Sequence, residues 1–369
     1  MRKIKNDTFG DGLNLCQKCP KLSPSPNVSK KVGWKVKVNN NEKIDFVILW
    51  VDGNDPEWIK EKNDFSGIIG DSKQNRFRDC DNMQYLFRGI EKYASWVNKI
   101  YFITWGHVPS WLDTNNEKIV VVKHEEFIPK EYLPTFNSNV IELNLFRIES
   151  LSERFVLLND DLFFLKPTKP EDFFKNGLPT DVYAEYTQLA TSYNDVHYMM
   201  KANILSIINK HFSKQDCVKK NLAKFLNVKY GALNYKTLHS IRFKKKFVGF
   251  WNFHAPQSYL KETFREIWDK EGENLDNACR NKFRASSDLG HYLCRYWQMV
   301  SGNFEPKKDE SKYIVFLDDN TENIKHLKSG KYKYVCINDA YMDIDFEKAK
   351  NEINATLQEL LPEKSEFEL

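Results

Sequence analysis

The sequence predicts an α/β fold in which a mostly parallel sheet is flanked by helices. Two observations in the first half of the chain lead to this prediction. Short apolar runs rich in β-branched residues alternate with segments of helical spacing, and the connections between them are short. Such alternation is typical of a parallel sheet that is covered on both faces. The second half alternates less regularly, and we expect a helical insertion there at about residues 190–300.

The predicted strands of the sheet are four apolar runs at 44–51, 100–105, 119–122 and 154–158. The first run is almost continuously apolar, as expected of a strand that is buried on both faces of a parallel sheet. It stops at the polar sequence Asp52-Gly53-Asn54-Asp55-Pro56. Ligands bind outside the carboxyl ends of parallel strands, so the loops after these strands are the expected ligand site.

Apolar residues at helical spacing predict the helices. A first helix face is formed by Met83, Leu86, Phe87, Ile90 and Ala94, and a second helix is expected over 139–150. In the second half we expect helices at about 198–210, 257–270 and 287–300, and strands near 313–317 and 332–337. A last helix places Phe346, Ala349, Ile353, Leu357 and Leu360 on one face. Its polar side is as acidic as it is basic, which favours packing on the body of the protein over membrane binding.

The chain divides into three parts. Residues 1–43 are rich in Lys, Asn, Pro and Ser and predict a loose leader, residues 44–340 form the predicted α/β domain, and residues 341–369 hold the last helix and a tail. No apolar stretch follows the charged N-terminus, and the longest apolar runs are too short to span a bilayer. We therefore expect a cytoplasmic protein that associates with a membrane at most peripherally.

Composition restricts the classes of protein further. Seven cysteines, an odd number, favour reduced thiols. Cys16 and Cys19 have the spacing of a zinc knuckle but no second such pair, so a structural zinc and an ordinary pair both stay open. The net charge of +4 argues against a surface for nucleic acid over the whole molecule. The aromatic content of 14% suits a large core, and a stacking surface for a sugar or a base is the alternative.

Two adjacent carboxylates, Asp160 and Asp161, follow Asn159 at the end of the predicted strand 154–158. Two like charges at the end of a buried strand repel each other, so a positive group is expected nearby. Mg²⁺ or Mn²⁺ is the natural candidate, since these ions prefer carboxylate oxygens and can hold the diphosphate of a nucleotide sugar. The alternative is a loop start in which Asn159 and Asp160 make turn and cap hydrogen bonds.

Further residues could complete such a site, although each of them alone is more often structural. Glu142 and Arg147 lie on the predicted helix that leads into this strand, so an acid and a cation can converge there. His254 precedes a turn at Pro256 that we expect to begin a helix, and an imidazole suits acid-base chemistry near neutral pH. Arg284 could neutralise a phosphate through its planar guanidinium group.

Four longer segments connect these residues. They are 44–55, a stretch from Arg78-Asp79 to Leu158-Asn159-Asp160-Asp161, His254-Ala255-Pro256 together with Arg284, and Val335-Cys336-Ile337-Asn338-Asp339. In this order they resemble the four signature regions of the Stealth family of sugar-phosphate transferases. The resemblance covers nearly everything from residue 44 to about 340, and the second region is long enough to be highly specific.

This resemblance implies a fold, an activity and a set of site residues. The family includes bacterial capsule and exopolysaccharide phosphotransferases and the catalytic part of the animal N-acetylglucosamine-1-phosphotransferase. It implies a metal-dependent enzyme with an A-type glycosyltransferase-like (Rossmann-like) α/β core. The functional residues of the animal enzyme correspond here to Glu142, Asp161, His254 and Arg284. One departure is Asp52, where the animal enzyme has Asn, and it affects the contacts of the donor loop.

The implied reaction is attack by a glycan hydroxyl on the sugar-bearing phosphorus of a nucleotide diphosphate sugar, expected to be UDP-linked, with release of the nucleoside monophosphate. We expect His254 or Asp161 to act as general base, Arg284 to bind the phosphates and Glu142 to orient the base or the acceptor. Donor and phosphate contacts are expected from Asp52, Asn54, Asp55, Arg78 and Arg147. Ligands for Mg²⁺ or Mn²⁺ are expected from Asp160, Asp161 and Asp339.

Two other functions stay open at the level of sequence. An ordinary glycosyltransferase would use the same donor but release the nucleoside diphosphate. A non-catalytic glycan-binding component of a polysaccharide assembly complex would transfer nothing. The expected partners are a nucleotide sugar and a glycan acceptor but no nucleic acid, with a peripheral association to such a complex at the inner face of a bacterial membrane.

Overall fold

The computed structural model describes residues 43–65, 67, 79–339 and 343–369. These residues belong to one compact unit that extends from Val38 to Leu369. Three predictions fall on residues outside the described ranges: the leader at 1–43 except its last residue, the zinc alternative at Cys16 and Cys19, and the phosphate contact of Arg78.

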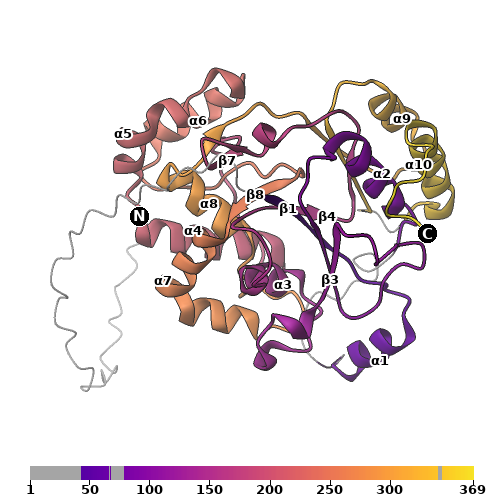
Figure 1. The fold of residues 1–369 in the computed structure, drawn as a ribbon. Helices are drawn as coiled ribbons and strands as arrows, with labels where there is room; N and C mark the ends of the chain where they lie inside the picture. The colour runs from indigo at the N-terminus through magenta and orange to yellow at the C-terminus, as the bar shows by residue number, and fades with distance from the viewer. Residues whose placement is uncertain (1–42, 66, 68–78, 340–342) are drawn as a thin grey trace, which may run out of the picture. The chain divides into compact units, whose positions relative to one another are not determined.

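A five-stranded sheet in the order β3-β2-β1-β4-β8 forms the centre of this unit (Figure 1). Its strands are β1 (Ile44–Leu49), β2 (Ile100–Thr104), β3 (Ile119–Lys123), β4 (Arg154–Asn159) and β8 (Gln257–Leu260). The first four are parallel and match the four predicted strands to within two residues, whereas β8 runs antiparallel to β4. The predicted α/β class with a mostly parallel sheet is therefore confirmed.

Successive side chains of the parallel strands enter two different hydrophobic cores, because residues of a strand alternate between its faces. Val47 and Leu157 pack into one core and Ile48 and Leu158 into the other. Figure 1 shows the helices between residues 196 and 301 on one side of the sheet. On the other side lie α2 (Met83–Ala94), α9 (Thr321–Lys328) and α10 (Phe346–Leu360). Coverage of both faces explains why β1 reads as a continuous apolar run.

The helices of the first half are α1 (Pro56–Asp64), α2 (Met83–Ala94) and α3 (Ser138–Asn144), and a 3₁₀ turn at Leu145–Arg147 follows α3. The next five helices are α4 (Val196–His211), α5 (Lys214–Phe225), α6 (Leu233–Phe243), α7 (Lys261–Cys279) and α8 (Tyr292–Ser301). The predicted helix at 83–94 and the predicted helical portion of the second half are confirmed. The helix expected over 139–150 is shorter, since it ends at Asn144.

One predicted helix begins differently. Pro256 does not start a helix: the strand β8 follows it, and α7 begins only at Lys261. Gln257 to Leu260 pair with Leu157 to Arg154 of β4, which would otherwise expose its backbone groups on that side. Backbone hydrogen bonds to a neighbouring strand thus outweigh the helical spacing of the apolar residues, a tertiary effect that local sequence does not contain.

The order of the strands fixes where a ligand site is expected. From β1 the chain proceeds outward through β2 and β3 and then returns to β4 on the other side of β1. Ligands of open α/β sheets bind outside the carboxyl ends of the strands at such a reversal. Leu49 and Asn159 are paired, so the loops that leave β1 and β4 begin side by side.

Two small sheets complete the unit. One contains β10 (Ser311–Val315), β11 (Tyr334–Asn338) and β5 (Leu162–Phe164), and the other β6 (Phe174–Lys175), β7 (Leu178–Asp181) and β9 (Glu305–Pro306). The strands predicted near 313–317 and 332–337 are therefore present as β10 and β11. Antiparallel pairing of β11 with β5 brings the end of β11 next to Asp161, whose carbonyl accepts the N–H of Ile337 at 2.8 Å.

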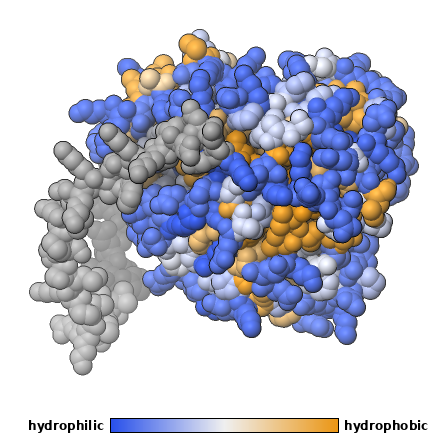
Figure 2. Space-filling model, in the orientation of Figure 1, coloured by the Kyte–Doolittle hydropathy of each residue, from blue (hydrophilic) through white to orange (hydrophobic). Residues whose placement is uncertain are grey.

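The C-terminal segment packs on this unit through α9 (Thr321–Lys328) and α10 (Phe346–Leu360). Ile353 and Leu357 of α10 are fully buried, and Arg88 of α2 donates to both carboxylate oxygens of Glu368 at 2.8 Å. The predicted packing of the last helix on the body is thus confirmed. In the described ranges we find no helix whose length and apolar character would let it pass through a bilayer. Figure 2 shows mainly hydrophilic side chains on one face, with an apolar area over the central strands.

Candidate active site

Carboxylates gather where the strands β1, β4 and β11 end. Asp52 follows β1, Asp160 and Asp161 follow β4, and Asp339 follows β11. Burial raises the pKa of the Cys80 thiol, and the charges of Asp160, Asp339, Asp79 and Asp161 raise it further, so these four carboxylates lie around that thiol. The charge of Asp52 acts in turn on Asp79. We call Asp52, Asp79, Asp160, Asp161 and Asp339 the acidic edge.

Asp160 shows the repulsion within the acidic edge. Its pKa is raised to about 7, first by the protein around it, which displaces water, and then by the charges of Asp161 and Asp79. Its side chain is nevertheless exposed at the surface, beside the two neighbouring carboxylates. Such mutual repulsion is relieved by a cation.

Asp161 is held in place by β11. The Cys336 thiol and the Asn338 side-chain amide donate to its Oδ2 at 3.1 and 3.2 Å. Its second carboxylate oxygen, Oδ1, is buried and accepts no hydrogen bond from a described residue. A buried carboxylate oxygen without a donor is costly unless a ligand reaches it, which makes Oδ1 a candidate contact for a cation or a substrate.

The acidic edge has the kind of ligands that a hard divalent cation prefers, but it does not supply a complete coordination shell. Carboxylate oxygens such as Oδ1 of Asp161 are the ligands that Mg²⁺ and Mn²⁺ prefer. Over the described part of the chain, however, no three His, Cys, Asp or Glu side chains are close enough to hold a metal ion. Mg²⁺ usually takes one or two carboxylates and completes its shell with water and substrate phosphates. A metal shared with a phosphate ligand therefore fits this edge better than a site made of protein alone.

The loop after β1 is fixed by hydrogen bonds of its own. Oδ1 of Asp55 caps α1 by accepting the N–H groups of Glu57 and Trp58 at 2.9 and 2.8 Å. Oδ1 of Asp52 accepts the N–H of Asn54 at 2.8 Å, and the Asn54 side chain is exposed. Asp52 and Asp55 thus shape the loop, while contacts of this loop with a donor stay a prediction.

His107 after β2 holds the β1 loop from the neighbouring strand. Its Nε2 accepts the backbone N–H of Asp52 at 2.8 Å, and its Nδ1 lies 3.6 Å from Oδ2 of Asp55. Because Nε2 accepts, a neutral ring carries its proton on Nδ1, toward Asp55. Burial lowers the pKa of His107 against the charges of Asp55 and Asp52, which favours this neutral ring. Sequence reasoning missed His107, although a histidine at the end of a parallel strand is a usable signal.

Glu142 and Arg284 lie close together at α3. Nη2 of Arg284 donates to Oγ of Ser138 at 2.8 Å, one turn before Glu142 on the helix. Glu142 is buried, and its Oε2 accepts the N–H of His291 at 3.4 Å. Burial raises the pKa of Glu142 to about 7, although Arg284 and the hydrogen bonds from His291 and Ser138 oppose the shift. Glu142 can therefore change its charge near neutral pH.

The loop that carries Arg284 is tied to α3 by Asp288, which is buried. Its Oδ2 accepts from the side-chain amides of Asn137 and Asn139 at 3.0 and 2.9 Å and from the N–H of Ala285 at 3.1 Å. These hydrogen bonds join the start of α3 to the segment just after Arg284. They hold Glu142 and Arg284 close together although the two residues are far apart in the sequence.

A cavity of about 150 Å³ contains His254, and we call it the histidine cavity. It is lined by Tyr186, Gln188, His197, Tyr198, Lys201, Trp251, Asn252, His254 and Tyr292. The ring of His254 lies 4.4 Å from that of Tyr313, whose hydroxyl donates to Oδ1 of Asn338 at 3.2 Å. Asn338 also donates to Asp161, so the histidine cavity and the acidic edge meet at this residue.

The histidine cavity combines neutral imidazoles with cations. Burial lowers the pKa of His197 to about 4 and that of Lys201 to about 8. Burial also lowers the pKa of His254, assisted by the charge of Lys201 and opposed by that of Asp161. Arg284 acts on His197 by its charge, so it lies near the cavity as well. Nζ of Lys201 lies 5.1 Å from the ring centroid of Tyr198, and the charge of Asp195 opposes the lowering of its pKa.

The four residues expected to be functional therefore lie in one region. Asp161 is joined to His254 through Asn338 and Tyr313, and Arg284 lies between the histidine cavity and Glu142. Their roles in a reaction stay predictions. Lys201 and His197 belong to the same region and were not anticipated. Lys201 is buried on the apolar face of α4, and a lysine in the buried stripe of a helix is the signal that could have identified it.

Arg147 does not converge with this region as expected. Its Nε donates to Asn144 at 2.8 Å, and its guanidinium group lies 4.7 Å from the ring centroid of Trp268 on α7. It precedes the amino end of β4, whereas Asp160 and Asp161 leave the carboxyl end of that six-residue strand, about 17 Å away. The contacts of Arg147 serve the packing of α3 against α7, and the structure gives no support for a phosphate contact.

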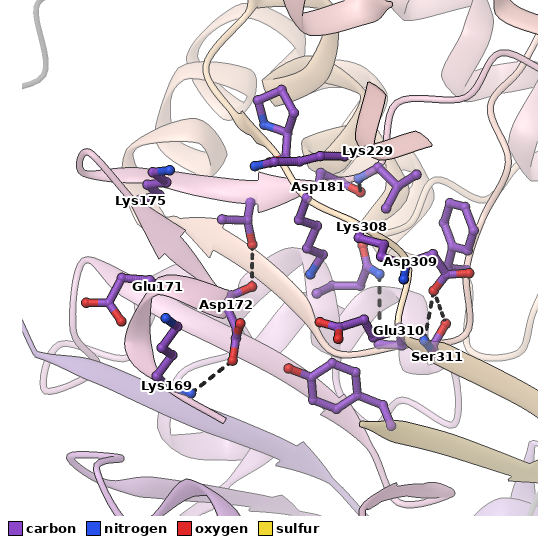
Figure 3. A pocket seen from close by; sticks show the side chains of 18 residues that line it. Lys169, Glu171, Asp172, Lys175, Asp181, Lys229, Lys308, Asp309, Glu310 and Ser311 are labelled. Atoms are coloured by element: carbon purple, nitrogen blue, oxygen red, sulfur yellow. Dashed lines mark hydrogen bonds between the residues drawn. The ribbon is translucent and has the colours of Figure 1, made fainter. Parts of the chain in front are cut away.

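A second, larger cavity of about 390 Å³ lies on the other side of the segment that carries His254. Phe253, Ala255 and Gln257 line it, but none of the four expected functional residues does. Figure 3 shows its charged walls, with Lys169 and Glu171 on one side and Asp309 and Glu310 on the other. Size alone would favour this cavity, and its lysines could also meet a phosphate. The smaller cavity is preferred because His254, one of the four expected functional residues, lines it.

Comparison with known proteins identifies the family. Residues 42–70 match "Stealth protein CR1, conserved region 1" and residues 76–181 match "Stealth protein CR2, conserved region 2". The chain is 44% identical to capsular polysaccharide phosphotransferase WcwK of Streptococcus pneumoniae over 336 residues. These residues cover 90% of this chain and 99% of the relative. It is 40% identical over 337 residues to receptor polysaccharide phosphotransferase WefC of Streptococcus gordonii, covering 89% of this chain and 99% of the relative.

A more distant relative carries a similar name. Exopolysaccharide phosphotransferase cps2G of Lactiplantibacillus plantarum is 34% identical over 327 residues, which is 88% of this chain and 96% of the relative. Two solved structures of the galactosyltransferase LgtC match 87% of this chain and 98% of theirs at 8% identity, with TM-scores of 0.36 and 0.41. Likeness at that level adds nothing to the fold already described. Near-complete coverage by named phosphotransferases rules out the non-catalytic alternative, and the chain belongs to the Stealth family as a phosphotransferase.

Proposed function

We propose that this phosphotransferase transfers a sugar 1-phosphate from a UDP-linked sugar to a hydroxyl of a glycan acceptor in the synthesis of a capsular or extracellular polysaccharide. The acceptor oxygen attacks the sugar-bearing phosphorus, the bond from that phosphorus to the bridging oxygen of the diphosphate breaks, and UMP leaves. The product holds a phosphodiester between two sugars. Relatives named as capsular, receptor and exopolysaccharide phosphotransferases support this role in polysaccharide synthesis.

The observation that carries the proposal is the meeting of two unlike regions at Asn338. The acidic edge supplies Asp161 on one side, and the histidine cavity supplies His254 and Lys201 on the other. Phosphoryl transfer needs alignment of the reacting groups and neutralisation of negative charge more than covalent help from the protein. A site with carboxylates for a metal, cations for phosphate and a neutral imidazole meets these needs.

Proton transfer is assigned to His254. Burial lowers its pKa, so the imidazole is neutral at neutral pH and can take the proton of the acceptor hydroxyl. Asp161 accepts hydrogen bonds from Cys336 and Asn338 and supports the imidazole by its negative charge. Glu142 accepts the backbone N–H of His291 and is assigned to orient the acceptor glycan through this residue.

Charge neutralisation is divided between the two regions. Lys201 and Arg284 face the transferred phosphate from the side of the histidine cavity. One or two carboxylates from the set Asp160, Asp161 and Asp339 would hold Mg²⁺ or Mn²⁺, which would supply positive charge for the diphosphate at the acidic edge. The β1 loop with Asp52, Asn54 and Asp55, together with Arg78, would contact the nucleotide. A peripheral association with an assembly complex at the inner face of the membrane belongs to the same proposal.

Incubation with a panel of UDP-hexoses and UDP-N-acetylhexosamines, Mg²⁺ and oligosaccharide acceptors tests the reaction. Chromatography of the released nucleotide should show UMP, formed in the presence of an acceptor. Release of UDP instead would favour the ordinary glycosyltransferase, which uses the same donor but attacks the anomeric carbon.

A further inference from the structure

Two large aromatic side chains stand partly exposed at the rim of the histidine cavity. Tyr186 is 43% exposed and Trp251 is 38% exposed, and both line the cavity that contains His254. Their rings lie 5.3 Å apart at an angle of 81° and so form a corner. Single exposed apolar residues are common on protein surfaces, but two of them beside one cavity mark a candidate binding surface.

A short antiparallel ribbon places both rings on the same face. The N–H of Tyr186 donates to the carbonyl of Gly249 at 3.1 Å, and the N–H of Trp251 donates to that of Ala184 at 2.8 Å. Between them, Glu185 and Phe250 are paired and almost completely buried. Successive residues of an extended chain point to opposite faces, so Tyr186 and Trp251 are directed outward.

Gly249 allows this ribbon to close. Its backbone angle φ is +135°, a conformation that residues other than glycine rarely adopt. A Cβ atom at this position would lie 2.4 Å from the carbonyl oxygen of Tyr186. Close approach of the two chains beside Trp251 therefore depends on a glycine.

A cation fixes the two rings without closing the cavity. Nζ of Lys236 on α6 lies 4.7 Å from the ring centroids of both Tyr186 and Trp251. Cation–π contacts of this kind restrict the motion of exposed aromatic side chains. The corner is thus held in a defined orientation although it is open to solvent.

We propose that Tyr186 and Trp251 form the subsite for the acceptor glycan, in which the apolar face of a pyranose ring stacks on the aromatic corner. This inference rests on the proposed function. The C–H groups of a sugar ring carry partial positive charge and pack favourably on the negative face of an aromatic ring. Trp251 is three residues from His254 in the same cavity, so a sugar stacked there presents a hydroxyl to the imidazole.

The size of the cavity agrees with this assignment. About 150 Å³ is less than the volume of cavities that enclose a whole drug-sized ligand. The histidine cavity therefore suits one sugar ring rather than a nucleotide sugar, and the donor is left to the acidic edge. The two substrates would approach His254 and Asp161 from different sides.

Kinetics of Trp251→Ala with the acceptor that the wild-type protein uses best in the panel test this subsite. We expect KM for the acceptor to rise about 10-fold or more, while KM for the donor stays unchanged. Trp251→Phe keeps an aromatic face and should recover most of the acceptor affinity. Tyr235→Ala is the matched control, because Tyr235 is 78% exposed on α6 and lines neither cavity.

An unchanged acceptor KM in Trp251→Ala, or an equal rise in the donor KM, would overturn the subsite. A wild-type protein that releases no UMP would instead contradict the proposed function. In that case a binding experiment tests the subsite without catalysis. Saturation-transfer NMR is recorded with methyl glucopyranoside, methyl galactopyranoside and methyl N-acetylglucosaminide as probes. Saturation of their ring protons should be seen with the wild-type protein and Tyr235→Ala but not with Trp251→Ala. Equal signals from all three proteins would refute the stacking surface.

Discussion

The acidic edge and the histidine cavity differ in origin and in charge, although they meet at Asn338. The acidic edge includes loops at the ends of β1, β4 and β11, and burial together with the charges of Asp161 and Asp79 raises the pKa of Asp160 to about 7. The histidine cavity is built from α4 and the segment before β8, and burial keeps its imidazoles neutral while Lys201 supplies positive charge.

This difference separates two tasks that one reaction requires. Crowded carboxylates repel a negatively charged donor, so in the proposed function a metal at the acidic edge would let the diphosphate approach. The histidine cavity would supply the groups that take up a proton and attract a phosphate. Changes in the two regions should therefore have different signatures, and four substitutions test this expectation in order of decreasing effect.

The largest effect is expected at the proton acceptor. His254→Ala should lower kcat about 10²- to 10⁴-fold, since the general base is lost, and should leave the dependence on Mg²⁺ unchanged. His239→Ala on the exposed side of α6 is the matched control and should keep full activity. A kcat for His254→Ala within a few-fold of the wild type would show that proton transfer does not pass through the histidine cavity.

Asp161→Asn should act through the metal. Asparagine keeps the size of the side chain and one oxygen but removes the charge, so we expect activity to fall at least about 10- to 100-fold and the Mg²⁺ concentration for half-maximal rate to rise. Chelation with EDTA should inactivate the wild type, and added Mg²⁺ should restore it. Asp269→Asn, at an exposed position on α7, is the control. Full activity in EDTA would contradict a metal at the acidic edge.

Lys201→Met tests whether the buried lysine of α4 serves the phosphate. Loss of a charged hydrogen-bond donor should lower kcat/KM about 10-fold or more. Thermal stability should not fall, because burial disfavours the charged lysine and methionine fills a similar volume. Lys219→Met on the exposed side of α5 is the control. A large loss of stability with unchanged kinetics would make Lys201 a structural residue.

Glu142→Gln should change how the stability of the protein depends on pH. The pKa of Glu142 is raised from 4.5 to about 7 by burial, so the wild type loses stability as the pH rises between these values, where the unfolded chain has already released the proton. Glutamine stays neutral, and the variant should gain up to about 3 kcal/mol on the wild type between pH 4.5 and pH 8. Denaturant unfolding at several pH values measures this gain. Glu273→Gln on α7, where the side chain is exposed, should show no such gain.

The first half of the fold could be predicted from the sequence because both faces of its sheet are buried. Each strand is then a continuous apolar run that ends at a polar residue, as β1 does before Asp52. The strand β8 could not be predicted, since the reason for its conformation is the free side of β4, far away in the sequence. Local spacing favoured a helix there and contained no information about this neighbour.

The candidate site, like the fold, could be predicted only in part from the sequence. Asp160 and Asp161 follow from the end of a strand, whereas Glu142, His254 and Arg284 needed the resemblance to a family. Lys201 was missed because helical spacing shows only that its position is buried, not what it faces. Closeness of Arg147 to Glu142 in sequence also does not show that Arg147, in the 3₁₀ turn after α3, contacts Trp268, so its phosphate contact stays a prediction.

The most direct test of the central claim follows the sugar-bearing phosphorus itself. A UDP-sugar that carries ³²P in the phosphate next to the sugar is incubated with the enzyme, Mg²⁺ and an acceptor glycan, and the products are separated. We predict that the label appears in the glycan product and that the released UMP is unlabelled. Label in released UDP, with an unlabelled glycan, would contradict the account and assign the enzyme to ordinary glycosyl transfer.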